Sequence, residues 1–411
     1  MTVLTGKLSK KHFMVAEDTL RVMHSLLRDG GDARFVGGCV RDALANRRII
    51  DIDIATPLKP EEVTQRLEAD KIQVIPTGLK HGTVTAVVDG RPFEITTLRR
   101  DIATYGRHAD VVFTDDWKAD AARRDFTINA MSATIDGDVY DYFSGMEDLR
   151  NGRIIFVGDA EKRVQEDILR ILRFFRFHAH FGKDEPQTAA LAACAKFADR
   201  LPRLSAERIR NETLKLLEAQ NCPAVWHLML QNRIVTHFLP EATNVAALER
   251  LVRLEEKYHS PGYVLRRLLA VLDVTVGGLM KVIESLRLSR EQGGHLLTLF
   301  EPGMEVDNRM DQAAIHRAVY RLGNDAVRSL LLLRAAREGR DDNLADTFQW
   351  ATAFRPPRFP LIGQDVLDLG YPQGPDVGRI LGDLESWWVA SDFAPGRTAC
   401  LEKLKREYAR G

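Results

Sequence analysis

A glycine pair followed closely by two aspartates limits what this chain can fold into. Phe35 and Val36 run into Gly37 and Gly38, and residues 39–46 have the pattern of a short helix. We interpret this as a strand, a tight turn and a helix start. Glycine lets the backbone approach a phosphate, and a helix N-terminus directs free N–H groups at it. Gly37 and Gly38 are therefore candidate nucleotide-binding residues.

The two aspartates, Asp51 and Asp53, lie in a predicted strand over residues 50–55. Alternate residues of a strand share a face, so their carboxylates project together and repel unless a cation lies between them. Mg²⁺ is usually bound through one or two carboxylates plus substrate phosphates. Either feature alone is common in ordinary turns and exposed strands. At this spacing they indicate a nucleoside triphosphate on the glycine turn, with metal on Asp51 and Asp53.

A third carboxylate is available on a predicted hairpin. Asp89-Gly90 is a strong turn signal between a strand over 83–88 and a return strand over 93–98. If the return strand pairs next to the aspartates, Glu94 completes the metal site. An exposed glutamate on an edge strand fits the pattern equally well.

Composition sets wider limits. A chain of 411 residues is too long for one typical core, so two or more domains are expected. The net charge is zero, so any nucleic-acid contact must come from local patches. The four cysteines are scattered without a paired spacing, which favours a reducing compartment, and we expect the cytoplasm. No classical secretion signal or membrane span is expected, because long apolar runs are missing.

Two polar segments follow the hairpin. Residues 99–117 are charged and lack clear periodicity, which predicts a long loop of the kind that is usually functional or mobile. Next comes an Arg-Arg-Asp triplet at a predicted helix start. Such a triplet is ordinarily a solvated ion-pair cluster, but after a nucleotide site Arg124 and Asp125 could hold a phosphate or a ribose hydroxyl.

Beyond residue 160 helical spacing dominates, and a predicted helix over 160–180 carries an unusual stripe. Asp167, Arg170, Arg173 and Arg176 recur every three residues, among many apolar side chains. A ladder of surface ion pairs would give the same spacing. Three aligned arginines on a helix this apolar instead suggest that they face something anionic or planar. Further on, residues 361–381 read as helix, glycine-rich turn and helix.

Taken together, these segments resemble the class II CCA-adding enzymes, which are tRNA nucleotidyltransferases of the polymerase-β superfamily. Three motifs and a tail pattern carry the resemblance, which spans nearly the whole chain. They are Gly37-Gly38, Val40-Arg41-Asp42, Asp51 and Asp53; the sequence RRDFTINA at 123–130; residues 166–177; and residues 361–378. Asn46 replaces a usual glycine and Ile168 a usual proline. We expect no consequence, since asparagine also tolerates a left-handed cap.

The resemblance implies an α+β nucleotidyltransferase head, a mixed sheet with flanking helices, followed by an all-α neck, body and tail. The expected bounds are 1–155, 156–240, 241–354 and 355–411. It implies Mg²⁺ on Asp51 and Asp53, with Glu94 as third catalytic carboxylate. Gly38 and Arg41 would hold the triphosphate, and Arg124 and Asp125 would select ribose. The implied substrates are ATP, CTP and the 3′ end of tRNA, with the tail on the tRNA elbow and no protein partner evident.

Base choice can be reasoned from hydrogen-bond chemistry. Cytosine and adenine both present an amino donor beside a ring-nitrogen acceptor, whereas guanine and uracil present the reverse pattern. A carboxylate paired with an arginine complements the first pattern and leaves buried charges unpaired against the second. We therefore predict that Asp167 and Arg170, one helical turn apart, serve as the template for C and A. Arg173 and Arg176 would support the phosphates or the base-reading groups.

Other functions share these motifs. A bacterial poly(A) polymerase typically carries a more basic stretch before the glutamate strand, whereas residues 77–84 look like the CCA-adding type. An enzyme that adds only CC would lack the segment 99–107, whereas an A-adding enzyme stays open. A catalytically dead tRNA-binding protein is disfavoured by intact Asp51, Asp53 and Glu94.

Overall fold

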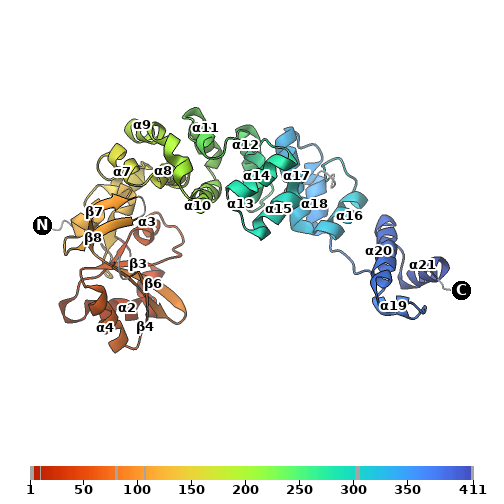
Figure 1. The fold of residues 1–411 in the computed structure, drawn as a ribbon, viewed down its shortest axis with the longest axis horizontal. Helices are drawn as coiled ribbons and strands as arrows, with labels where there is room; N and C mark the ends of the chain where they lie inside the picture. The colour runs from red at the N-terminus through yellow and green to blue at the C-terminus, as the bar shows by residue number, and fades with distance from the viewer. Residues whose placement is uncertain (1–3, 10, 79–81, 106–107, 301–305, 409–411) are drawn as a thin grey trace. The chain divides into compact units, whose positions relative to one another are not determined.

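The computed structural model describes residues 4–9, 11–78, 82–105, 108–300 and 306–408. The chain separates into two compact units, Met1–Pro240 and Glu241–Gly411. The first unit contains a mixed sheet with flanking helices and then helices alone, and the described part of the second is helical (Figure 1). This is the α+β head followed by helices that the sequence predicted. The finer division into four domains stays a prediction.

An eight-stranded sheet forms the centre of the head. Its strands in spatial order are β1 (Leu4–Lys7), β10 (Asp138–Asp141), β9 (Met131–Ala133), β2 (Arg34–Val36), β3 (Asp53–Thr56), β6 (Arg91–Thr97), β5 (Thr83–Val88) and β4 (Gln73–Gly78). Every neighbouring pair in this sheet is antiparallel except β3 and β6, which run parallel.

The single parallel pair decides where the carboxylates lie. In its register Asp53 is opposite Glu94 and Ile54 is opposite Ile95. Because side chains alternate across a strand, the two isoleucines enter the core on one face and the two acids project from the other. The return strand therefore does pair beside the aspartates. Asp51 lies two residues before the beginning of β3 and not within a strand, which corrects the predicted strand over 50–55.

Helices cover the apolar face of the sheet. The head helices are α1 (His12–Val15), α2 (Glu17–Leu27), the 3-10 turn η1 (Arg28–Gly30), α3 (Gly38–Leu44), α4 (Pro60–Ala69), α5 (Trp117–Ala122), η3 (Thr127–Asn129) and α6 (Gly145–Asn151). Met23 of α2, Val40 of α3 and Leu67 of α4 share one buried cluster with Phe35 and Phe93 of the sheet. Burying each such side chain contributes roughly 1.5–3 kcal/mol, so this layer fixes the sheet.

The segment predicted as a long polar loop is instead a hairpin. β7 (Arg99–Tyr105) and β8 (His108–Phe113) form a separate two-stranded antiparallel sheet. Residues 106–107 at its tip lie outside the described residues, as do 79–81 in the stretch that separates the CCA-adding type from poly(A) polymerases. At the base of the hairpin, Thr114 N donates to Leu98 O at 2.9 Å, which connects the hairpin to the residue directly after β6.

The predicted helix over 160–180 is two helices with a break at Asp167 and Ile168. The helices that follow the sheet in the first unit are α7 (Ala160–Glu166), α8 (Leu169–Phe181), α9 (Thr188–Lys196), η4 (Ala198–Arg203), α10 (Ala206–Leu217), α11 (Cys222–Gln231) and η5 (Val235–His237). Asp167 is extended, with φ −149° and ψ 107°, and Ile168 has φ −57° and ψ −25°. That φ is the value a proline would impose, so Ile168 keeps the geometry of the residue it replaces.

The described part of the second unit is a series of helices. They are α12 (Val245–Lys257), α13 (Val264–Val271), α14 (Val276–Ser285), α15 (Arg290–Phe300), α16 (Gln312–Leu322), α17 (Asn324–Glu338), α18 (Leu344–Ala353), α19 (Gly363–Leu367), α20 (Pro375–Ala390) and α21 (Arg397–Tyr408). The last three share a core that includes Ile380, Leu384 and Trp388. α19 and α20 are the predicted helix, glycine-rich turn and helix, and Arg397 of the third helix, α21, forms an ion pair with Asp365 of α19.

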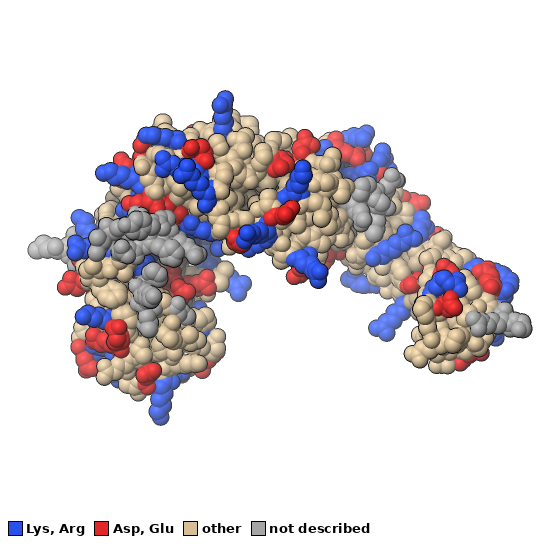
Figure 2. Space-filling model, viewed as in Figure 1, with Lys and Arg blue, Asp and Glu red and all other residues tan. Residues whose placement is uncertain are grey.

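Charge is mixed on the molecular surface. Figure 2 shows Lys and Arg interspersed with Asp and Glu over the visible face of each unit, in keeping with the net charge of zero. All four cysteines are free and buried. Among the described residues, no helix has the length and apolar character needed to cross a membrane.

A buried ion triad in the second unit gives a test of its packing. Glu255 of α12 accepts hydrogen bonds from Arg266 Nη2 (2.7 Å) and Arg267 Nε (2.8 Å), and each of the three residues is at most 3% exposed. Removing the carboxylate charge leaves two buried cations without it, so Glu255→Gln should destabilise this unit by about 3–5 kcal/mol. Hydrogen exchange of the full chain should show faster exchange in α12 and α13.

Glu249→Gln is the matched control, because Glu249 lies on the same helix and pairs with Arg253 at the surface. Exposed pairs contribute about 0–1 kcal/mol, so its exchange should stay close to wild type. Equal protection of α12 and α13 in the two variants would contradict this account of the triad.

Candidate active site

The turn between β2 and α3 requires glycine. Gly37 has φ 69° and ψ −125°, a conformation that side chains rarely adopt, and its N–H donates to Met131 O at 3.3 Å. A Cβ there would lie 2.8 Å from Arg124 Nη1 and 3.9 Å from Asp53 Oδ2. The bare backbone of Gly37 therefore lets Arg124 and Asp53 approach the beginning of α3.

The carboxylates beside this turn are electrostatically coupled. Asp53 is partly buried, whereas Asp51 and Glu94 are exposed. Burial raises the pKa of Asp53, the neighbouring Glu94 and then Asp51 add to this, and Arg124 opposes it. Like charges held close favour a bound cation. The charges of Glu94 and Asp51 thus act on Asp53, which lies directly opposite Glu94 in the sheet.

Oxygen ligands of this kind fit a hard divalent cation. Within the described residues, no three His, Cys, Asp or Glu side chains gather closely enough to form a complete metal cage.

Arg41, predicted to hold the triphosphate, is mostly buried and well held. Its Nε and Nη2 donate to the two oxygens of Asp42 at 2.9 Å each, and Nη1 donates to Asn129 Oδ1 at 2.7 Å. Its guanidinium lies 5.0 Å from the ring centre of Phe177 and 4.6 Å from that of Phe181. These contacts to α8 connect the glycine turn to the helices beyond the sheet.

Arg124 and Asp125 follow the end of α5, which corrects the predicted helix start at this triplet. Arg124 Nη2 lies 3.4 Å from Asp120 Oδ2, and Arg124 faces Gly37 as described above. Asp125 is 8% exposed and accepts hydrogen bonds from Asn129 Nδ2 at 3.0 Å and Arg173 Nε at 2.7 Å. Its carboxylate is engaged within the protein, so a direct contact with ribose would have to replace one of these bonds.

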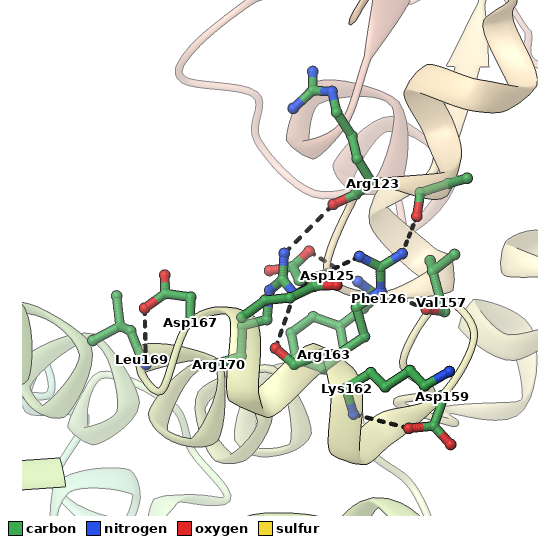
Figure 3. A network of polar contacts seen from close by, with 12 residues as sticks. Arg123, Asp125, Phe126, Val157, Asp159, Lys162, Arg163, Asp167, Leu169 and Arg170 are labelled. Carbon is green, nitrogen blue, oxygen red and sulfur yellow. Dashed lines mark hydrogen bonds and ion pairs between the residues drawn. The ribbon is translucent and has the colours of Figure 1, made fainter. Parts of the chain in front are cut away.

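Asp167 and Arg170 do not pair with each other. Asp167 accepts hydrogen bonds from Leu169 N at 3.2 Å and Arg208 Nη2 at 2.7 Å. Arg170 Nη1 donates to Glu166 Oε2 at 2.5 Å and to Arg163 O at 2.9 Å. Figure 3 shows Arg170 directed toward Arg163 and Arg123, with the Asp167 carboxylate turned away toward Leu169. The break between α7 and α8 separates their partners, so the assumption of one continuous helix was wrong.

The arginine stripe does face anions, and they belong to the protein. Arg173 pairs with Asp125 at 2.5 Å and lies 3.7 Å from Glu212, while Arg176 Nε pairs with Glu212 at 2.5 Å. Glu212 of α10 is 7% exposed, and sequence reasoning missed both it and Arg208. The only local signal is an acid within the buried stripe of an amphipathic helix, which does not reveal its partner.

Comparison with known proteins agrees with this geometry. A family model described as "Poly A polymerase head domain" matches residues 33–155, and one described as "Probable RNA and SrmB- binding site of polymerase A" matches residues 185–245. The mitochondrial CCA tRNA nucleotidyltransferase 1 of Danio rerio is 33% identical, covering 98% of this chain and 94% of that protein. The CCA-adding enzyme of Lactobacillus gasseri is 31% identical, covering 94% and 96%.

A solved structure gives the same result. The Bacillus stearothermophilus CCA-adding enzyme in complex with CTP superposes with a TM-score of 0.73 at 28% identity, covering 95% of this chain and 97% of that one. The fold and the glycine-and-carboxylate site define a nucleotidyltransferase of the polymerase-β superfamily. Within it, the chain belongs to the class II CCA-adding enzymes. Enzymes of this family generally use divalent metal ions.

The buried pair of Arg173 and Asp125 predicts a pH-dependent stability. Burial alone would raise the pKa of Asp125, but the charge of Arg173 and the hydrogen bonds from Asn129 and Arg173 hold it below its usual range. A lowered pKa stabilises the fold above the unfolded pKa of about 3.9, and this contribution is lost as the pH falls through the folded pKa.

Arg173→Met should therefore lower stability by roughly 1–3 kcal/mol near neutral pH, because Asp125 keeps its burial and loses its cation. The difference from wild type should shrink as the pH falls into the acid range, because Asp125 without its cation can take up a proton in the folded state. Thermal melting at several pH values measures it. Lys196→Met, which breaks the exposed pair with Glu161, should show little effect. A stability difference between wild type and Arg173→Met that stays constant with pH would contradict the prediction.

Proposed function

We propose that the chain adds CCA to the 3′ end of tRNA from CTP and ATP, without a nucleic-acid template, and releases pyrophosphate. The observation that carries the proposal is Asp53 held opposite Glu94 beside a glycine turn, in a chain aligned over 98% of its length with a CCA tRNA nucleotidyltransferase. The acceptor is the 3′ end of tRNA, and we assign the tRNA elbow to the helices of the tail.

Each residue near the turn has an assigned part in this reaction. Asp51 and Asp53, with Glu94, would hold Mg²⁺, which supplies charge neutralisation of the triphosphate and activation of the 3′ hydroxyl. Gly37, Gly38 and Arg41 bind the triphosphate. Arg124, whose guanidinium lies next to Gly37, binds the phosphates or the ribose.

Base selection is assigned to Asp167 and Arg170, supported by Arg173 and Arg176. A carboxylate accepts from the amino group of C or A and an arginine donates to the ring nitrogen, whereas G and U leave both charges unpaired. Asp167 binds Arg208 and Arg170 binds Glu166, so a base would compete with these partners for both side chains. The ion pair with Arg173 holds Asp125 against the same helix.

For localisation we propose the cytoplasm, supported by four free cysteines without disulfides. The animal relative named above is mitochondrial and the bacterial one carries no such label. Fractionation of the source cell tests this assignment.

Product length tests the proposed function. The protein is given Mg²⁺ and tRNA ending at the discriminator base, at C or at CC, with each nucleoside triphosphate alone and all together. We expect exactly the missing nucleotides of CCA and then a stop. A long A tail would identify a poly(A) polymerase, extension only of the CC-ended tRNA an A-adding enzyme, and no incorporation a tRNA-binding protein.

The template assignment has its own test. Asp167→Ala should reduce the preference for C and A over G and U more than it reduces the rate with the best nucleotide, because the acceptor for the amino group is lost. Addition of G or U, compared with C or A, to tRNA ending in C or CC measures the preference. Asp159→Ala is the control, since it removes only the N-cap of α7, where Asp159 accepts from Lys162 N at 2.8 Å. Unchanged base preference in Asp167→Ala would exclude the assignment.

A further inference from the structure

One buried carboxylate near the site has no part in the reaction described so far. Asp120, in the last turn of α5, is 3% exposed. Its Oδ1 accepts hydrogen bonds from Arg123 Nε (3.0 Å), Arg123 Nη2 (2.8 Å) and the backbone N of Arg99 (3.2 Å). Its Oδ2 lies 3.4 Å from Arg124 Nη2. A single buried acid thus joins three separate groups.

The helix that carries Asp120 is firmly placed. Asp116 caps its N-terminus by accepting from Lys118 N and Ala119 N at 2.9 and 3.2 Å. The next residue, Trp117, donates from Nε1 to Asp32 Oδ2 at 2.8 Å and packs with Val36 and Ala55 of the sheet. Because α5 is fixed to the strands that also carry Asp53 and precede Gly37, the Asp120 carboxylate has a defined position relative to the site.

On one side this carboxylate restrains Arg124. The Arg124 guanidinium lies over Gly37, 2.8 Å from where a Cβ would be, and its charge acts on Asp53. An arginine side chain is long and has many rotamers, so a fixed acid behind it selects the one that faces the turn. Burial would raise the pKa of Asp120, but Arg123 and Arg124 lower it, which keeps the acid charged.

On the other side it holds the root of the hairpin. Arg99 is the first residue of β7, and its backbone N–H donates to the same carboxylate. The hairpin of β7 and β8 therefore begins at the group that also orients Arg124. Because Asp120 contacts both the first residue of β7 and Arg124, a movement of either one would act on the other through this carboxylate.

We propose that Asp120 is a positioning residue that holds Arg124 against Gly37 for nucleotide binding and connects it to the root of the β7–β8 hairpin. This inference rests on the proposed function, because its readout is nucleotide incorporation. The competing account is a purely structural ion pair that stabilises α5. The two accounts differ in whether the effect of Asp120 depends on Arg124.

The central variant is Asp120→Asn, which keeps the shape and removes the charge. Losing a hydrogen bond between charged groups corresponds to a roughly 10- to 100-fold effect. We expect KM for CTP and ATP to rise by a common factor in that range, with kcat changed less and tRNA affinity unchanged. Asp116→Asn at the N-cap of the same helix removes a charge and keeps a good cap, without touching Arg124, so it should leave both KM values at wild type.

A double-mutant cycle separates positioning from structure. In an Arg124→Lys background the guanidinium fork is gone, so Asp120→Asn should add little to KM. Additive effects of the two changes would overturn the proposal, as would a wild-type KM for Asp120→Asn alone. A purely structural role predicts the same loss in both backgrounds.

A second variant covers the case in which Asp120→Asn does not fold. Asp120→Glu keeps the charge and moves the carboxylate by one methylene, so positioning predicts a raised KM in a folded protein, whereas charge balance alone predicts a wild-type KM. Wild-type incorporation of CTP into tRNA lacking CCA is measured alongside. If wild type incorporates nothing, the proposed function fails. If it is active and the cycle is additive, only the role of Asp120 fails.

Discussion

The parallel pairing of β3 with β6 is the constraint on which the site depends. It puts Asp53 opposite Glu94, two acids that repel, on the face of the sheet away from the main core. Burial and these neighbouring acids raise the pKa of Asp53, so the arrangement costs stability in the absence of a cation. The apolar layer that includes Ile54 and Ile95 offsets this cost. The geometry of the proposed metal site is thus held by packing on the opposite face of the same strands.

A second dependence links the sheet to the helices after it. Asp125 comes directly after Arg124, and its partner Arg173 lies on α8, which also supplies Phe177 against Arg41. Glu212 of α10 then holds Arg173 and Arg176 from behind. Asp125, which we assign to ribose, therefore shares an ion-pair network with Arg173 and Arg176, which we assign to supporting base reading. We expect a substitution in one of these residues to change the effect of a substitution in another, because effects within one network are rarely additive.

Local signals in the sequence predicted the elements that carry the site, and tertiary contacts decided the remainder. The Asp89-Gly90 turn, the glycine turn at Gly37 and the left-handed Asn46, with φ 53°, follow from backbone chemistry that a few residues encode. The β7–β8 hairpin was missed because charges interrupt the alternation that marks a half-buried strand. Glu212 was missed because the residues around it in the sequence do not indicate which cation it will pair with in the fold.

The break at Asp167 separates the two side chains that we assign to base reading. With no proline at Ile168 the sequence pattern reads as one helix, yet the extended Asp167 and its contacts to Leu169 N and Arg208 end α7 at Glu166. Both side chains that we assign to base reading therefore have partners of their own. Cytosine or adenine has to offer them better hydrogen bonds than these partners do, whereas guanine and uracil cannot. The cost of releasing the partners is the same for every base, so it lowers affinity, and the discrimination comes from the hydrogen-bond pattern of the base itself.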